Sequence, residues 1–557
     1  MRSRLPASRP ARPALLALAL TAGSLAGCGG DGGEAQPAPP PMAQSCQPLH
    51  LEARDGDGPA ALLDGPAFAV RPAGFGIDPA TAKVDSVQID GRPVHVLRVA
   101  VTTFEDRFGR DWVHELAVLA PHAKDLAATD AAAFSAGVGT LHPVGPDDTD
   151  PVWGTEHPEW FAGTDTAERL ILSYGRAALD LGIPFAAADV VPAEIELDAE
   201  LAADIRTAAQ SNDDPCDDDW CQGPITNDDM KMACLMRAAL VRQDLSLDPY
   251  LNLAVAESRL IDAAEAALEA LYAQQDEPVE LSWSRVWAVG SSKRGNTQRL
   301  AAALDERIQG VQISAADVAN FPAFAALQLA LWPGAYSFEP KTMAALLGTA
   351  FGEQYLRAFD MARWKPSVLD GVDMTVVVGT RDPLYPHGTI LLYAEALPAG
   401  FHSVLVPNYG HGQGTVDHVG AFRALLAQGL DGKAWPRVEA RWDVSTAQVQ
   451  ATSDGDASAV ELWCSESWED NSNVKDVGAD CTPVPMHATN GTDLRHALWA
   501  RHPMTPAGER MWSAPVPDLA LSYPACFVRA QSAQGWPATS LPLFSAALCQ
   551  AAGLGLE

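Results

Sequence analysis

The stretch "VWAVGSSKRGNTQRL", residues 286–300, decides the fold of this chain. An apolar run ends at Gly290, the polar residues "SSKR" follow, and a helix-like pattern begins after Gly295. This order is typical of a nucleophile elbow, a tight turn between a strand and a helix that exposes a serine hydroxyl. We therefore interpret Ser292 as a candidate nucleophile, with a serine in an ordinary turn as the alternative. The usual second glycine, two residues after the serine, is replaced by Arg294.

Two later segments supply the partners that such a serine needs. "MTVVVGTRDPLYP" reads as a buried strand followed by Asp382, and "HSVLVPNYGHG" reads as the next strand followed by His411. The chain order of nucleophile, acid and histidine, each after a strand, is the order expected for this type of turn. In this chemistry the histidine accepts the hydroxyl proton, and the carboxylate fixes its tautomer and stabilises the imidazolium. We therefore predict that Ser292, Asp382 and His411 form one catalytic set.

Backbone N–H groups should stabilise the negative charge that develops in such a reaction. The first is predicted to be the N–H of Lys293, the residue after the nucleophile. The second should come from the loop after the third strand, and Gly137 and Gly139 in "SAGVGT" are the candidates. The ammonium group of Lys293 could contribute as well, with a solvated lysine as the alternative.

The rest of the pattern predicts an α/β architecture. Strand-like runs alternate with helical segments, which indicates a parallel sheet covered by helices on both faces. A polar and helical insertion interrupts this pattern at about residues 195–280. From residue 435 onward, short alternating runs separated by turn residues replace the long helices and predict a β-sandwich. We therefore expect an α/β domain over 46–434 and an all-β domain over 435–557.

These motifs together resemble a known family. "GSSKRG" followed by "AALDERIQGV" is similar to the nucleophile region of the PhoPQ-activated pathogenicity-related proteins. "MTVVVGTRD" and "PNYGH" resemble the acid and histidine loops of that family, and "NDDMKMA" and "VELWCSESWED" look like two further landmarks. The resemblance runs from about residue 90 to about residue 475, although Asn296 stands where the family has tryptophan and residues 120–160 match poorly.

The resemblance implies an α/β-hydrolase fold and a serine hydrolase activity. An esterase is the expected enzyme, acting on a small molecule, a glycan ester or a peptide. A prolyl-oligopeptidase-like peptidase is the first alternative. The second is a non-catalytic envelope protein that keeps the scaffold as an interaction surface.

The N-terminal segment predicts export. Basic residues, an apolar run and small residues follow one another over 1–27, as in a secretory signal peptide. "LAGC", residues 25–28, resembles a bacterial lipobox, which implies lipidation of Cys28, with a plain signal peptide as the alternative. Residues 28–45 are rich in Gly and Pro and are expected to form a flexible tether. We expect a lipid-anchored protein of the bacterial cell envelope, at the outer membrane, facing the periplasm or the outside.

The cysteines agree with an oxidising compartment. Nine cysteines less Cys28 leave an even set, which suggests disulfides. Cys464–Cys481 and Cys526–Cys549 are predicted as local pairs. The pairing of the others is left open; these are Cys46, Cys216, Cys221 and Cys234.

Composition bears on partners and ligands. The net charge of −33 argues against nucleic acid, which requires basic patches. No CxxC pair with partnering histidines is present, so no metal and no cofactor are expected. The acidic loop 212–229 could bind calcium, but a solvated loop is the favoured interpretation because the spacing is not that of an EF-hand. We expect a monomer.

Overall fold

The computed structural model has two parts, residues 1–39 and 40–557, and all residues that it describes belong to the second part. The described residues are 48–51, 54–60, 75–105, 111–137, 166–192, 194–210, 221–226, 228–316, 319–324, 348–382, 385, 388–443, 446–468, 475–477, 483–485, 497–517, 525–544 and 549. Cys28, the signal peptide and the tether predicted from the sequence lie outside these residues.

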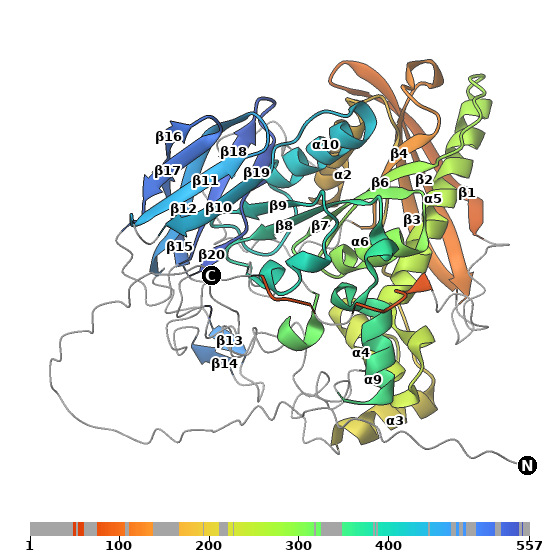
Figure 1. The fold of residues 1–557 in the computed structure, drawn as a ribbon. Helices are drawn as coiled ribbons and strands as arrows, with labels where there is room; N and C mark the ends of the chain where they lie inside the picture. Colours follow the sequence, from red (N-terminus) through yellow and green to blue (C-terminus); the bar gives the residue numbers. More distant parts are fainter. Residues whose placement is uncertain are drawn as a thin grey trace, which may run out of the picture. The chain divides into compact units, whose positions relative to one another are not determined.

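A mixed sheet forms the centre of the fold (Figure 1). Its first nine strands lie in the order β1-β2-β3-β5-β4-β6-β7-β8-β9. The strands β5, β4, β6, β7, β8 and β9 run parallel to one another, whereas β1, β2 and β3 pair antiparallel. Their bounds are Gly76–Ile89 (β1), Arg92–Glu105 (β2), Asp111–Pro121 (β3), Ala131–Ser135 (β4), Phe185–Ala188 (β5), Arg285–Ser291 (β6), Ile308–Ser314 (β7), Asp373–Gly379 (β8) and His402–Val406 (β9).

Helices cover both faces of this sheet, as the sequence predicts. Strand β6 shows why, because its residues are apolar on both sides, which is typical of a buried parallel strand. Val286 and Ala288 belong to the core that contains α5 (Pro249–Gln274) and α6 (Lys293–Leu304). Trp287 and Val289 belong to the opposite core, which contains α2 (Thr166–Leu179) and α10 (Val416–Asp431).

The predicted insertion between β5 and β6 is helical. It contains α3 (Ala199–Gln210), α4 (Asp228–Arg242) and α5. The start of α5 follows from its local sequence, since the buried Asp248 side chain accepts a hydrogen bond from Leu251 N at 3.0 Å. Pro249 occupies the first helical turn, where its missing N–H costs nothing. A further helix, α9 (Ala350–Phe359), lies between β7 and β8 in the chain.

The C-terminal part contains two sheets that face each other across a hydrophobic core, so the predicted sandwich-like region is present, together with a separate two-stranded sheet. The first sheet, β19-β18-β12-β15 with β20, continues the central sheet, because β19 pairs with β9 at Thr539 and Ser403. The second sheet has the order β10-β11-β17-β16. Val449 of the second sheet and Val528 of the first belong to the same core. The strands are Val438–Asp443 (β10), Gln448–Ser453 (β11), Ala457–Trp468 (β12), Lys475–Val477 (β13), Pro483–Pro485 (β14), Ala497–Pro503 (β15), Thr505–Gly508 (β16), Met511–Pro515 (β17), Ala525–Ser532 (β18), Pro537–Thr539 (β19) and Leu543–Phe544 (β20).

The disulfides correct the predicted local pairs. Cys464 bonds with Cys526, not with Cys481, and Cys526 therefore does not bond with Cys549. The reason is the register of β12 and β18, which places Cys464 directly opposite Cys526 with 4.1 Å between the Cα atoms. Cys549 is also disulfide-bonded.

The other predicted cysteines belong to the insertion or precede the first strand. Cys221 and Cys234 form a disulfide between the middle of α4 and the segment before this helix. Cys46, Cys216 and Cys481 lie outside the described residues.

None of the helices in the described ranges is long and apolar enough to cross a membrane.

Candidate active site

Ser292 lies on the turn between β6 and α6, at the carboxyl edge of the parallel sheet. Its backbone has φ 56° and ψ −130°, a conformation that residues with a side chain rarely adopt. The turn is held by a hydrogen bond from Ser292 N to Ser314 O of β7, at 2.9 Å. Helix α6 begins at the next residue, Lys293, so that Ser292 stands at the N-terminal end of the helix. This is the strand–turn–helix geometry predicted for the candidate nucleophile.

Two glycines make this turn possible. A Cβ atom on Gly290 would lie 2.5 Å from the carbonyl oxygen of Arg294. A Cβ atom on Gly295 would lie 2.7 Å from the Cβ of Ala316, in the segment after β7. Gly295 therefore allows helix α6 to approach the sheet closely. It stands three residues after Ser292, one position later than the usual second glycine of this turn. This shift leaves room for a side chain at position 294.

His411 and Asp382 meet in the loops after β9 and β8. His411 Nδ1 lies 2.9 Å from Asp382 Oδ2, and the Asp382 side chain is fully buried, whereas that of His411 is 22% exposed. The other carboxylate oxygen, Oδ1, accepts a hydrogen bond from Tyr385 N at 3.0 Å. The ring of Tyr385 stacks against His411, with 5.8 Å between the centroids. When Nδ1 carries the proton, it donates a hydrogen bond to Asp382 Oδ2, and the neutral imidazole presents Nε2 as its basic nitrogen.

The loop of His411 reaches the side of the elbow. Gln413 Nε2 donates to the carbonyl oxygen of Gly137, in the segment after β4, at 3.3 Å. A Cβ atom on Gly137, which has φ 147°, would lie 2.9 Å from Nε of Arg294. Strand β4 lies beside β6 in the sheet, so residues 137, 294 and 411–413 gather at one edge. Gly137 thus lies near Arg294 of the elbow, whereas Gly139 lies outside the described residues.

Arg294 is a buried arginine at the centre of an ionic cluster that the sequence did not reveal. Its guanidinium donates to Asp189 at 2.6–3.0 Å and to Asp228 at 2.8 Å. Asp189 directly follows β5, and Asp228 begins α4 within the landmark "NDDMKMA". The Lys231 ammonium donates to Asp228 at 3.1 Å and to the carbonyl of Pro192 at 2.7 Å. The cluster therefore joins the elbow to the helical insertion.

Burial alone would lower the pKa of Arg294, but the charge of Asp189 and the hydrogen bonds to it raise that pKa on balance. The pKa of Asp228 is lowered because Arg294 and Lys231 outweigh the effect of burial. Arg294 and Asp228 are therefore charged. The one signal in the sequence is the arginine at a position where this turn usually has glycine.

The strand order, the parallel strands β4 to β9, and the elbow after β6 define an α/β-hydrolase fold. Residues 251–475 match the model of one family within this class, "PhoPQ-activated pathogenicity-related protein". The match confirms the resemblance seen in the motifs and includes the segments of Ser292, Asp382 and His411. No curated protein sequence matches the chain.

Several solved structures are similar to this chain in backbone fold. The acetyl xylan esterase from Paenibacillus sp. R4 is 15% identical, with 65% of this chain and 91% of that one covered and a TM-score of 0.33. A CE15 glucuronoyl esterase from Teredinibacter turnerae T7901 is 12% identical, with 70% and 89% covered and a TM-score of 0.35. A puromycin-hydrolyzing peptidase of Mycobacterium tuberculosis is 14% identical, with 63% and 39% covered and a TM-score of 0.30. Values this low carry no information on the substrate of this chain.

Proposed function

We propose that this protein is a serine hydrolase that cleaves an ester through an acyl-enzyme on Ser292. The observation that supports this most is the left-handed backbone of Ser292 on a tight strand-to-helix turn. Strained backbone of this kind is concentrated at functional sites, where surrounding structure maintains it. The hydrogen-bonded pair of His411 and Asp382, in loops at the same sheet edge, supplies a base and its orienting carboxylate.

The reaction begins with proton transfer from Ser292 to His411. Nε2 of His411 accepts the hydroxyl proton as Oγ of Ser292 attacks the carbonyl carbon, which requires a separation of about 2.6–3.2 Å between Nε2 and Oγ. Asp382 keeps the proton on Nδ1 and stabilises the imidazolium. The N–H of Lys293 and the N-terminal end of α6 stabilise the oxyanion, with Gly137 beside them.

The second half of the reaction returns the enzyme to its starting state. His411 donates its new proton to the leaving alcohol, and the ester carbonyl re-forms on Ser292. Water then attacks the acyl-enzyme while His411 accepts its proton. His411 returns this proton to Oγ of Ser292 as the bond between Oγ and the acyl carbon breaks, and the acid product leaves. An ester is favoured over a peptide bond because an alcohol is a better leaving group than an amine. The substrate class is a small-molecule or glycan ester, with a peptide as the alternative.

We also propose that the enzyme acts as a lipid-anchored monomer in the bacterial cell envelope. The basis is the signal-like segment 1–27, the lipobox-like "LAGC" and the tether over 28–45. Cys28→Ala should leave an unprocessed precursor or release soluble protein during membrane fractionation. Unchanged membrane partitioning of this variant would contradict the anchor.

Labelling with a fluorophosphonate probe tests the serine mechanism directly. The protein should react at one site, and Ser292→Ala should abolish the labelling while its melting temperature stays close to that of the parent. Ser291→Ala is the matched control, because Ser291 is the buried neighbour in β6 and should not be needed for labelling. Labelling that persists in folded Ser292→Ala would reject Ser292 as the nucleophile.

A further inference from the structure

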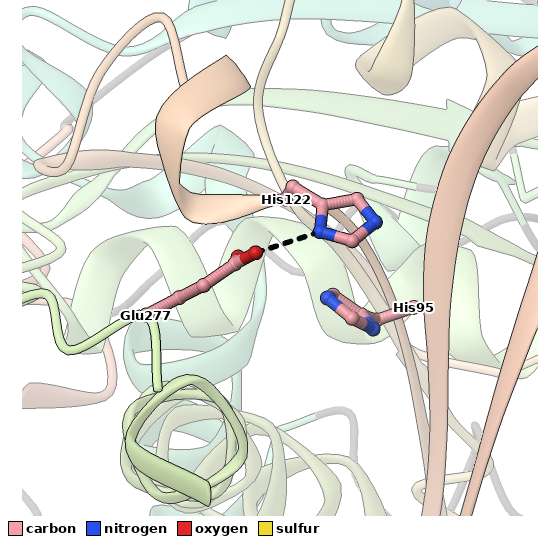
Figure 2. A group of neighbouring side chains, drawn as sticks. All are labelled: His95, His122 and Glu277. Carbon is pink, nitrogen blue, oxygen red and sulfur yellow. Dashed lines mark hydrogen bonds and ion pairs between the residues drawn. The ribbon is translucent and has the colours of Figure 1, made fainter. Parts of the chain in front are cut away.

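Three side chains that are far apart in the sequence meet at a second place in the fold. His95 lies in β2, His122 directly follows β3, and Glu277 lies shortly after the end of α5. Figure 2 shows the two imidazoles and the carboxylate turned toward one another. One possible ligand atom of each residue lies within 4.8 Å of those of the other two. The two imidazole rings are 4.3 Å apart between their centroids.

The hydrogen bonds of these three side chains leave one buried nitrogen unsatisfied among the described residues. His95 is only 4% exposed, and its Nε2 has no hydrogen-bond partner in the described part of the chain. A buried polar atom without a partner is costly, and a bound ligand at this place would satisfy it. Glu277 is held in place, because Oε1 lies 2.9 Å from His122 Nδ1 and Oε2 accepts from Ala123 N at 3.0 Å.

We propose that His95, His122 and Glu277 bind a zinc ion. Two imidazole nitrogens and one carboxylate oxygen form a ligand set that suits zinc, whereas calcium and magnesium prefer sites made of oxygen atoms. Tetrahedral zinc with bonds of about 2.0–2.1 Å separates its ligand atoms by about 3.4 Å, so small side-chain adjustments close the present spacing. The side chains of His122 and Glu277 are 22% and 28% exposed, which allows water to complete the coordination.

The position of this site indicates a structural ion. Strand β3 runs antiparallel to β5, with Leu119 opposite Phe185 at the amino end of β5. The end of β3 therefore lies at the amino edge of the parallel strands, whereas Ser292 lies at the carboxyl edge. A zinc ion here would link β2 and the β3 loop to the end of α5, and would add stability without entering the hydrolytic reaction. This inference reverses the expectation from the sequence that no metal is bound.

Zinc binding is tested on tag-free mature protein, because a histidine tag would bind zinc itself. After treatment with a chelator and dialysis, titration with Zn²⁺ should show one tight site, and the melting temperature should rise with zinc concentration. His122→Ala and Glu277→Gln should each lower the zinc affinity by at least about 10- to 100-fold. Loss of a residue that only hydrogen-bonds to a metal ligand already has an effect of this size. Both residues are partly exposed, so folding should survive, and fluorophosphonate labelling checks that it does.

His50→Ala is the matched control. His50 Nδ1 also lies 3.1 Å from a glutamate, Glu395, but this exposed pair belongs to no group of three potential ligands among the described residues. The zinc affinity of the His50→Ala variant should equal that of the parent protein. The site would be rejected if the parent binds no zinc tightly, or if its affinity is the same in folded His122→Ala and Glu277→Gln. Loss of affinity in His50→Ala to the same degree would also reject it.

Discussion

Arg294, two residues after the elbow serine, is bound through two guanidinium nitrogens to Asp189 at the carboxyl end of β5. In the sheet, β4 separates β5 from β6, so this ion pair spans the edge of the sheet beside the candidate active site. The arginine side chain is 4% exposed. The turn that carries Ser292 is therefore stabilised by an ion pair to the end of β5 as well as by its own strand and helix.

Removal of Arg294 should be destabilising. Arg294→Ala removes the 4% exposed guanidinium that Asp189 and Asp228 share. Because the Asp189 side chain is 40% exposed and Asp228 keeps Lys231, the loss should stay below the about 3–5 kcal/mol typical of a fully buried pair. Arg285→Ala is the control, because the Arg285–Asp130 pair at the start of β6 is partly exposed and should contribute less than about 1 kcal/mol. Denaturant unfolding measures both free energies. Equal losses in the two variants would contradict a structural role for the ionic cluster.

The three candidate catalytic residues should act as a unit. Ser292→Ala and His411→Ala should each reduce kcat/KM for an activated ester nearly as much as the double variant does, because the serine and its base act in the same step. Asp382→Asn should cost less, since the imidazole remains but is poorly oriented. Steady-state kinetics with a p-nitrophenyl ester measures these effects. Fully additive losses would show that Ser292 and His411 act independently.

The elbow should not tolerate a methyl group at Gly290. Gly290→Ala places Cβ against the Arg294 carbonyl, and overpacking of this kind typically costs about 1–3 kcal/mol. It should also lower fluorophosphonate labelling, since the turn must shift. Gly400→Ala is the control, because the nearest atom to a Cβ there is 3.8 Å away. Normal stability and labelling of Gly290→Ala would mean that the close approach at the turn is not required.

The buried Glu257 of α5 should make stability fall as pH rises. Burial raises the pKa of Glu257 to about 8, although its hydrogen bond from Gln298 of α6 opposes this shift. The folded protein therefore holds a proton that the unfolded chain releases near pH 4.5. The contribution is full below that pH and is lost progressively as pH rises through about 8. Glu257→Gln should flatten this part of the dependence, measured as the free energy of unfolding between pH 5 and pH 9. An unchanged slope would contradict the assignment.

The sequence predicts those parts of the fold and site that depend on local patterns. Buried strands followed by polar loops located Asp382 and His411, and their hydrogen bond confirms that these loops meet. Strand β1 was not predicted, because most of its residues are exposed and its pattern lacks clear apolar alternation. The long-range pairs were not predicted either. Asp189 lies 105 residues before Arg294, and no local spacing relates the two.

The disulfides and the zinc site show the same limit. Nearest neighbours in the sequence suggested Cys464–Cys481, but the register of β12 and β18 decides the bond. The proposed zinc ligands come from a strand, a loop and a helix end, so they lack the close spacing by which metal motifs are recognised. Contacts between residues far apart in the sequence can be predicted only after the order of the strands in the sheet is known.

The pairing of β19 with β9 has a consequence for how this chain reaches its native state. Strand β9 would otherwise expose a row of unpaired backbone groups, which is a template for association between molecules. Thr539 covers it through its backbone pairing with Ser403 and a hydrogen bond to the carbonyl of that residue. These partners are 136 residues apart. A nascent chain in which β9 has formed therefore carries an open sheet edge until Thr539 has been synthesised, and chaperone demand should be greatest in that interval.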